Sequence, residues 1–233
     1  MSAGAQLPLE LPARPALGRG DFFVSESNRL AVAQVEALRR AGRLALAGPE
    51  GAGKSHLVAV WAGATGAAVV AAEALEGAEP AALAARGAVA VEDGDRGLSA
   101  EGERALFHLH ERLAAAGGAL LLTGRTPPGR WAVALPDLAS RLAAIPLARI
   151  EGPDDALMEA LALKLFADRG VAVEAGLPRW LALRAPRSHA ALAEAVARLD
   201  RAGLARGARL TRKLAAAVLD ADGGAMEPSR SSR

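Results

Sequence analysis

The feature that most constrains this chain is an eight-residue stretch rich in glycine. It reads Gly48-Pro49-Glu50-Gly51-Ala52-Gly53-Lys54-Ser55. It follows an apolar run at residues 44–47 and precedes a helical pattern that starts at His56. A strand, a glycine-rich turn and a helix, in that order and with the spacing G-x-x-x-x-G-K-S, are typical of a phosphate-binding loop. The stretch therefore predicts an α/β fold built around a bound nucleotide.

The chemistry of phosphate binding explains the residue types in this loop. Glycines let the backbone turn so that its N–H groups lie close to an anion, and the helix N-terminus adds positive potential. Lys54 can reach the β- and γ-phosphates, and the Ser55 hydroxyl can ligate Mg²⁺. We therefore expect ADP or ATP with Mg²⁺ as cofactors. The residues expected to contact the nucleotide here are Gly48, Gly51, Ala52, Gly53, Lys54, Ser55 and His56.

Composition narrows the class of protein further. The 233 residues suffice for one nucleotide-binding domain and a small second lobe. The chain has no cysteine, which excludes disulfides, thiolate metal sites and a cysteine nucleophile. Its formal net charge is +2, and its heavy use of Ala, Gly, Arg and Pro is typical of codon bias in a GC-rich genome, so we do not interpret its many arginines as one nucleic-acid surface. No stretch resembles a signal peptide or a membrane-spanning helix, so we expect a cytoplasmic protein without a membrane partner.

Hydrophobic patterning divides the chain into four parts. An α/β core is expected at 21–150 and a helical lid at 151–221, between a flexible tail at 1–20 and a disordered tail at 222–233. Short apolar runs bounded by turn residues predict strands at 43–47, 67–72, 88–91, 119–123 and 147–150. Helical patterns predict helices at about 53–63, 99–116, 154–169, 176–184, 188–203 and 211–220, with another across Leu138 to Leu142. The first helix, ending near Arg40, is expected to have Ser25 or Ser27 as its N-cap.

Two carboxylates follow the apolar run at 88–91. Glu92 and Asp93 would lie at the C-terminal end of a buried parallel strand, which is the edge of an open α/β sheet where ligands bind. One carboxylate would hold Mg²⁺ and the other would orient the attacking water. We assign Glu92, with Ser55, to the metal and Asp93 to catalysis. A solvated strand end is the alternative interpretation.

Three arginines are candidates for contacts with phosphate. Arg141 lies on a helix after a Pro-Asp turn, where spacing alone favours a surface salt bridge. Arg184 and Arg187 flank Pro186 just before the third lid helix. Either could point back at the phosphates, or each could be an ordinary surface arginine beside a helix.

The N-terminal tail carries an alternating pattern. Leu7, Leu9 and Leu11 follow Gln6, and in an extended peptide the three leucines share one face. Because an isolated tail gains nothing by exposing leucines to water, the pattern indicates a peptide that binds a groove on a partner protein.

The order of these motifs is similar to that of the AAA+ ATPases. The run Phe22-Phe23-Val24-x-x-Ser27-Asn28-Arg29-Leu30 resembles a segment that lines the adenine site in the replication initiator DnaA. This implies that Phe23, Val24 and Asn28 contact the base. The run Leu135-Pro136-Asp137-Leu138-Ala139-Ser140-Arg141-Leu142, together with Thr123-Gly124 and Pro127-Pro128, resembles the Hda family of DnaA-related regulators. The resemblance extends over about residues 6–221.

The resemblance implies partners and a role for Arg141. In this family an arginine at that position acts in trans on the ATP site of an adjacent DnaA, and the peptide Gln6, Leu7, Leu9 and Leu11 matches the segment that binds the DNA polymerase III sliding clamp (its beta subunit). DNA would be engaged only indirectly, through the clamp, and a homodimer stays open. The location implied is the bacterial cytoplasm, at the nucleoid and replisome.

Three positions depart from the family pattern. Glu92 occupies a position where the family usually has Asp, and Arg125 occupies the position where Asp follows Thr-Gly. Ala190 occupies the position of the lid arginine that contacts the γ-phosphate in the family. Arg187, one turn earlier, is a possible substitute for that arginine. Each departure argues against efficient ATP hydrolysis by this chain. The predicted function is a nucleotide-bound regulator that stimulates hydrolysis of DnaA-bound ATP and prevents re-initiation. The alternatives are an AAA+ helicase loader or motor and a non-enzymatic clamp adaptor.

Overall fold

A single parallel sheet forms the centre of the N-terminal half of the protein. The structure is a computed structural model that describes residues 23–39 and 41–220. Five strands pair in the order β2-β3-β4-β1-β5. Their bounds are Gly42–Ala47 (β1), Ala68–Ala71 (β2), Ala88–Glu92 (β3), Ala119–Gly124 (β4) and Leu147–Arg149 (β5). All five strands that the sequence predicts are present, and the fold class is the expected α/β arrangement.

The strand order places the glycine-rich loop at the middle of the sheet. β1 pairs along its whole length with β4, and its last three residues pair with β5. Every residue of β4 is buried, as are the last four of β1. Parallel strands covered on both faces read as continuous apolar runs, which is why these segments could be found in the sequence.

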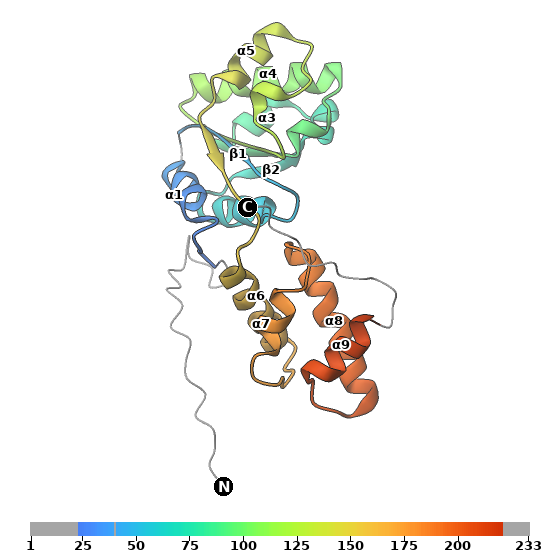
Figure 1. The fold of residues 1–233 in the computed structure, drawn as a ribbon. Coiled ribbons are helices and arrows are strands. Elements are labelled where there is room, and N and C mark those ends of the chain that lie inside the picture. Colours follow the sequence, from blue (N-terminus) through green and yellow to red (C-terminus); the bar gives the residue numbers. More distant parts are fainter. Residues whose placement is uncertain (1–22, 40, 221–233) are drawn as a thin grey trace, which may run out of the picture.

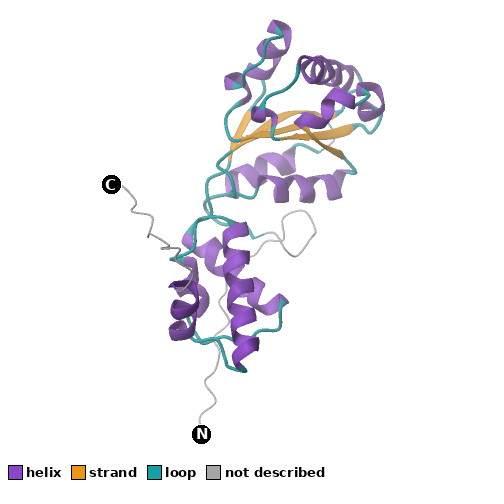
Figure 2. Cartoon of the chain, turned by 90° about the vertical axis from the view of Figure 1, so that its right-hand side faces the viewer, coloured by secondary structure: helices purple, strands orange, loops and turns teal. Residues whose placement is uncertain are grey.

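Helices cover both faces of this sheet. On one face α1 (Arg29–Ala37) and α2 (Lys54–Thr65) pack against it, with Trp61 and Leu57 fully enclosed. On the other face α4 (Ala100–Ala115) and α5 (Pro136–Ala143) pack over a second apolar cluster, next to α3 (Pro80–Ala84). Figure 2 shows the strands sandwiched between these two layers.

Four further helices form a separate lobe with its own apolar core. They are α6 (Asp155–Asp168), α7 (Leu177–Ala182), α8 (His189–Arg206) and α9 (Arg212–Asp220). Phe166, Leu181 and Val196 are among the side chains buried between them. The lobe lies beside the α/β layers and joins them through the segment after β5 (Figure 1). We call α6–α9 the lid.

The segment between β2 and β3 contains structure that the sequence patterns did not predict. A 3₁₀ helix, η2 (Ala72–Gly77), buries Leu75, and α3 follows with Pro80 at its first turn. Two more 3₁₀ turns follow β3 and β4, namely η3 (Gly94–Arg96) and η4 (Pro128–Arg130). Elements of three to six residues span no more than two helical turns, which is too short for a repeating apolar pattern to appear.

The predicted capping of the first helix is wrong. α1 begins at Arg29 and ends at Ala37, and neither Ser25 nor Ser27 caps it. The Asn28 side chain instead shapes the preceding turn, because its Oδ1 accepts from the Ser25 N–H (2.9 Å) and its Nδ2 donates to the Phe23 carbonyl (2.9 Å).

Within residues 23–39 and 41–220, no helix is long and apolar enough to cross a bilayer.

Candidate nucleotide-binding site

The loop between β1 and α2 adopts a phosphate-binding shape. Gly51 and Gly53 both have positive φ, 77° and 94°, a conformation that residues with a side chain rarely adopt. A Cβ on Gly51 would lie 2.3 Å from the Ser188 Cβ, and one on Gly48 would lie 2.2 Å from the Ile150 carbonyl oxygen. The glycines therefore allow the loop to turn and also to pack closely against the lid and the end of the sheet.

Lys54 is held at the mouth of this loop. Its side chain is only 8% exposed, and its Nζ donates to the carbonyl oxygens of Gly48 (2.7 Å) and Pro49 (2.9 Å). Burial lowers the pKa of the ammonium group, while the carboxylates of Asp93, Asp95 and Glu50 act in the opposite direction. An ammonium that can exchange two carbonyl partners for phosphate oxygens fits a nucleotide at this position.

A cavity of about 370 Å³ opens beside the loop, a volume suited to a small molecule. We call it the loop cavity. Its wall combines residues of the loop, the N-terminal segment, the ends of β3 and β4, and the lid. The lining residues are Phe23, Asn28, Glu50, Gly51, Ala52, Gly53, Lys54, Ser55, His56, Asp93, Arg96, Arg125, Pro153, Leu157, Leu161, His189 and Ala190.

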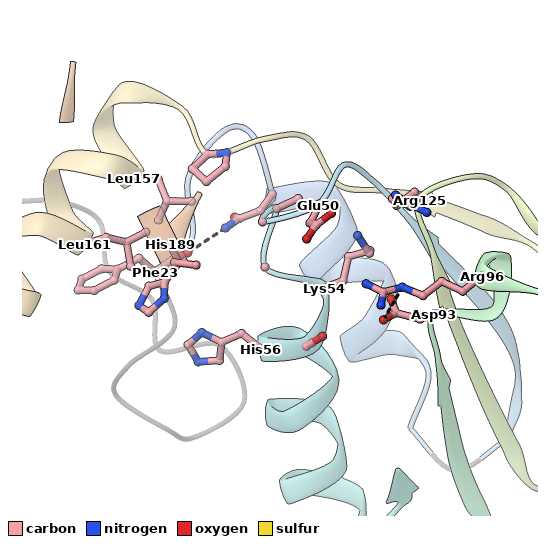
Figure 3. A pocket seen from close by; sticks show the side chains of 17 residues that line it. Phe23, Glu50, Lys54, His56, Asp93, Arg96, Arg125, Leu157, Leu161 and His189 are labelled. Carbon is pink, nitrogen blue, oxygen red and sulfur yellow. Dashed lines mark hydrogen bonds and ion pairs between the residues drawn. The ribbon is translucent and has the colours of Figure 1, made fainter. Parts of the chain in front are cut away.

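The loop cavity has two chemically different ends (Figure 3). The charged end contains Glu50, Lys54, Asp93, Arg96 and Arg125. The apolar end contains Phe23, Leu157 and Leu161, together with the imidazoles of His56 and His189. A charged end for phosphates and an apolar, aromatic end for a base are the two surfaces that a nucleotide requires.

The apolar end differs in detail from the expected adenine site. Phe23 and Asn28 line the cavity, as expected, but both functions of the Asn28 amide are used within the Phe23–Asn28 turn. Asn28 thus positions Phe23. Val24 is not on the cavity wall and packs against the core cluster beneath α1 and α2.

The lid is tied to this N-terminal segment by one carboxylate. Asp154 caps α6 by accepting from the Leu157 N–H (2.8 Å), and its other oxygen accepts from the Ser27 N–H (3.2 Å). The backbone of Ser27 also accepts from the Glu151 N–H (3.2 Å). Because Phe23 belongs to the N-terminal segment and Leu157 to the lid, this junction holds the two walls of the apolar end together.

The two carboxylates that follow β3, Glu92 expected at the metal and Asp93 expected in catalysis, lie in different surroundings. Glu92 is not on the cavity wall, and its Oε1 is buried without a hydrogen-bond partner among the described residues. Asp93 does line the cavity, but its Oδ2 lies 3.3 Å from the Arg96 Nε in an ion pair. No group of three or more His, Cys, Asp or Glu side chains in the described residues could hold a metal ion. The loop cavity therefore fits a nucleotide and places the Ser55 hydroxyl on its wall, while the assignment of Glu92 to the metal stays a prediction.

The predicted lid arginine is not at the loop cavity. Arg187 forms an ion pair with Asp155 and donates to the Pro153 carbonyl (3.2 Å), in a separate hollow at the start of α6. Arg184 stacks on Trp180 at 4.4 Å. Ala190 is the residue of the α8 start that faces the cavity beside His189. Asp155, the first residue of α6, binds the Arg187 guanidinium, and the assignment of Arg187 to the nucleotide stays a prediction.

Arg141 lies on α5, outside the loop cavity, and is held at the surface by two groups of α4. Its Nε donates to Glu111 Oε1 at 2.7 Å, and its guanidinium carbon lies 4.9 Å from the centre of the Phe107 ring. The hydrogen bonds from Arg141 and His110 lower the pKa of Glu111 to about 2, so the ion pair persists at neutral pH. Within the described part of the chain, no hydrogen bond uses the terminal Nη atoms of Arg141. The guanidinium is therefore oriented, 35% exposed, and able to donate to a second molecule.

A buried carboxylate of α4 fixes the start of the helix that carries Arg141. Glu103 is 5% exposed and accepts from the backbone N–H groups of Ala134 (2.9 Å) and Leu135 (2.8 Å). These N–H groups precede the first turn of α5, which has no side-chain cap of its own. Glu103, which belongs to α4, thus accepts hydrogen bonds at the start of α5 as an N-cap side chain would.

Replacing Glu103 with alanine should destabilise the protein. We expect the free energy of unfolding to fall by about 2–3 kcal/mol, because buried N–H groups lose a charged acceptor. Chemical denaturation followed by circular dichroism measures this change. Glu101→Ala is the matched control, since Glu101 is an exposed carboxylate in the same helical turn, and we expect it to change stability by less than about 0.5 kcal/mol. Equal stability of the two variants would contradict the assignment.

Comparison with known proteins places the fold. No family model matches the sequence. Domain III of the replication initiator DnaA from Thermotoga maritima is similar in structure, with a TM-score of 0.73, 17% identity, 94% of this chain covered and 100% of that chain. AMPPCP-bound DnaA from Aquifex aeolicus gives a TM-score of 0.64 at 18% identity, covering 82% of this chain and 67% of that one.

The similarity extends to a second kind of protein that acts on DNA. The Holliday junction branch migration motor RuvB from Thermotoga maritima gives a TM-score of 0.65 at 14% identity, covering 85% of this chain and 70% of that one. Identities this low report on the fold alone. The chain has the AAA+ fold, a parallel α/β core with a helical lid, which it shares with domain III of DnaA and with RuvB.

Proposed function

We propose that this protein is a nucleotide-bound regulator of replication initiation that stimulates hydrolysis of ATP bound to DnaA, and so prevents re-initiation. Similarity to domain III of DnaA supports a place among AAA+ replication proteins. The charged and apolar ends of the loop cavity support the proposal that a nucleotide binds there, and an AMPPCP-bound DnaA is among the structural neighbours of this chain.

The observation that carries the proposal is the position of Arg141. The side chain is remote from the loop cavity of its own chain, so it cannot act on the nucleotide held there. It is nevertheless positioned by Glu111 and Phe107 with its terminal nitrogens unengaged by the described residues. A pre-oriented cation without a role in its own site suits the ATP site of an adjacent molecule.

The chemistry assigned to Arg141 is electrostatic. Charge builds up on the transferred phosphoryl group in the transition state, and a guanidinium placed there stabilises that state more than the ground state. An arginine supplied in trans in this way raises the rate of nucleotide hydrolysis by about 10³–10⁵. The nucleotide of this chain would instead hold the core and the lid together, since residues of both line the cavity.

The clamp-binding peptide is the second part of the proposal. Gln6, Leu7, Leu9 and Leu11 lie outside the described residues, and the argument for them is the sequence pattern alone. Binding to the sliding clamp on DNA would bring Arg141 close to DnaA and would confine the activity to replicating DNA.

Deletion of residues 1–12 should abolish clamp binding without changing the stability of the folded part. We expect the loss because an extended peptide with three leucines on one face supplies the whole contact. Surface plasmon resonance on immobilised clamp measures binding, and a thermal melt measures stability. A variant with serine at positions 7, 9 and 11 tests the leucines within a full-length chain. Unchanged clamp affinity in both proteins would overturn this part of the proposal.

A clamp adaptor without an effect on DnaA is the second candidate, and the alternating leucines favour it as much as they favour the regulator. The two differ in one readout, the fate of radiolabelled ATP bound to DnaA in the presence of clamp and DNA. The regulator accelerates its conversion to ADP, whereas an adaptor leaves it unchanged. A helicase loader or motor is less well supported, because Asp93, the candidate catalytic base, is ion-paired to Arg96.

A further inference from the structure

The charged end of the loop cavity contains more cations than the phosphate-binding loop provides. Beside Lys54, two arginines from other segments reach the wall, Arg96 from η3 and Arg125 from the end of β4 (Figure 3). The anionic side chains on this wall are Glu50 and Asp93. Asp93 is paired with Arg96, and Asp95, buried behind the wall, is paired with Arg125, so each arginine still has its terminal Nη atoms available to an anionic ligand.

Both arginines have donors to spare. Arg96 contacts Asp93 through Nε at 3.3 Å, and Arg125 contacts Asp95 through Nε at 3.7 Å. Over the described ranges, no hydrogen bond involves the terminal Nη atoms of either residue. Their side chains are 58% and 53% exposed, so a ligand can reach them. A guanidinium fork matches the spacing of phosphate oxygens and binds them in pairs.

The two arginines are held by a buried framework. Asp95, whose side chain is 7% exposed, accepts from the backbone N–H groups of Arg125 (2.8 Å) and Thr126 (3.3 Å). Trp131 packs on Gly94, where a Cβ would lie 2.3 Å from the ring, and its Nε1 donates to the Thr126 carbonyl (2.9 Å). The turn that carries Arg96 and the loop that carries Arg125 are therefore locked to each other.

Electrostatics supports the same grouping. Burial is the main cause that lowers the pKa of Lys54, the carboxylates of Asp93, Asp95 and Glu50 oppose it, and the positive charge of Arg125 adds to it, so Arg125 and Lys54 lie close enough to interact. Cations placed near one another repel, and the arrangement is relieved by an anionic ligand between them.

We propose that Arg96 and Arg125 bind the terminal phosphates of the nucleotide together with Lys54, supplying the positive charge that Mg²⁺ would otherwise supply, so that nucleotide binding does not depend on Mg²⁺. This inference rests on the proposed nucleotide binding at the loop cavity. It assigns a phosphate-contacting role to two residues outside the glycine-rich loop. It also fits a cavity wall that offers the Ser55 hydroxyl to a metal ion, while one of its two carboxylates, Asp93, is already paired with Arg96.

The experiment measures the affinity of the full-length protein for ADP by isothermal titration calorimetry, in excess MgCl₂ and in excess EDTA. We expect the two dissociation constants to agree within about twofold. In EDTA, Arg125→Ala and Arg96→Ala should each weaken ADP binding by about tenfold or more, because each removes a charge-assisted contact with phosphate. Arg130→Ala is the control, an exposed arginine of η4 that is not on the cavity wall, and we expect no change.

A second readout separates phosphate contact from a structural effect. AMP lacks the terminal phosphate, so each variant should reduce the ratio of ADP affinity to AMP affinity, whereas a misfolded site would weaken both ligands equally. Arg125→Lys keeps the charge that faces Asp95 and should lose only part of the affinity. ADP binding that requires Mg²⁺, or an unchanged ADP-to-AMP ratio in both alanine variants, would overturn the inference. Absence of ADP binding in either buffer would overturn the proposed nucleotide binding itself, and this inference with it.

Discussion

Arg141→Ala should abolish the stimulated hydrolysis of ATP bound to DnaA. We expect the rate to fall by about 10³-fold, the lower limit for an arginine supplied in trans, because no other donor replaces the guanidinium in the transition state. Clamp binding and nucleotide binding should stay unchanged, since Arg141 lies outside the loop cavity and the N-terminal peptide. The measurement follows labelled nucleotide on DnaA over time with saturating clamp on DNA.

Two further variants sharpen that result. Arg112→Ala removes an exposed arginine from the neighbouring helix α4 and should leave stimulation intact, so it controls for loss of surface charge. Glu111→Gln weakens the ion pair that orients Arg141 (2.7 Å) and should give a partial loss. Full stimulation by the Arg141→Ala variant would remove this residue from the mechanism.

Lys54→Ala should remove nucleotide binding at the loop cavity. The ammonium is at the centre of the charged end, and we expect the dissociation constant for ADP to rise by about a hundredfold, equivalent to about 2.7 kcal/mol. The loss should be visible as lost thermal protection. At a concentration of 100 times the wild-type dissociation constant, ADP should stabilise the wild type by about 2.7 kcal/mol and the variant by only about 0.4 kcal/mol.

The control for this experiment is Lys213→Ala, which removes an exposed lysine of α9 far along the chain from the loop. It should bind ADP as the wild type does. Without nucleotide, Lys54→Ala should melt below the wild type, because the carbonyls of Gly48 and Pro49 lose their donor, so the protection by ADP is measured against the nucleotide-free melt of each protein. Retained ADP affinity in the Lys54→Ala protein would place the nucleotide elsewhere.

The fold was largely predictable because its core is simple. Buried parallel strands produce short apolar runs, and each of the five runs in this sequence became a strand. The lid helices carry ordinary caps, such as Asp154 and Ser188, whose side chains accept from the N–H groups expected of an N-cap. The start of the first helix could not be predicted from capping preferences. Asn28 uses its amide to close the turn before α1, a tertiary choice that capping preferences do not anticipate.

The site was less predictable than the fold. The spacing of its residues identifies the glycine-rich loop in the sequence. Leu157 and Leu161 have the spacing of core residues on a helix, and they line the cavity only because the lid packs beside it. Arg187 has the sequence position of a phosphate ligand, but in the structure its guanidinium forms an ion pair with Asp155. Arg96 belongs to no motif, and Arg125 stands where the family pattern has Asp, so neither was expected to contact phosphate. Their convergence depends on Asp95 and Trp131, which join segments about 30 residues apart.

The central claim is that this protein acts on a nucleotide held by another molecule. It is tested most directly by binding radiolabelled ATP to DnaA, adding clamp-loaded DNA, and following the conversion of ATP to ADP with and without this protein. We predict rapid conversion only when the protein is present, with a rate that tracks its concentration and is lost in Arg141→Ala. Identical ATP lifetimes on DnaA in the two reactions would contradict the account.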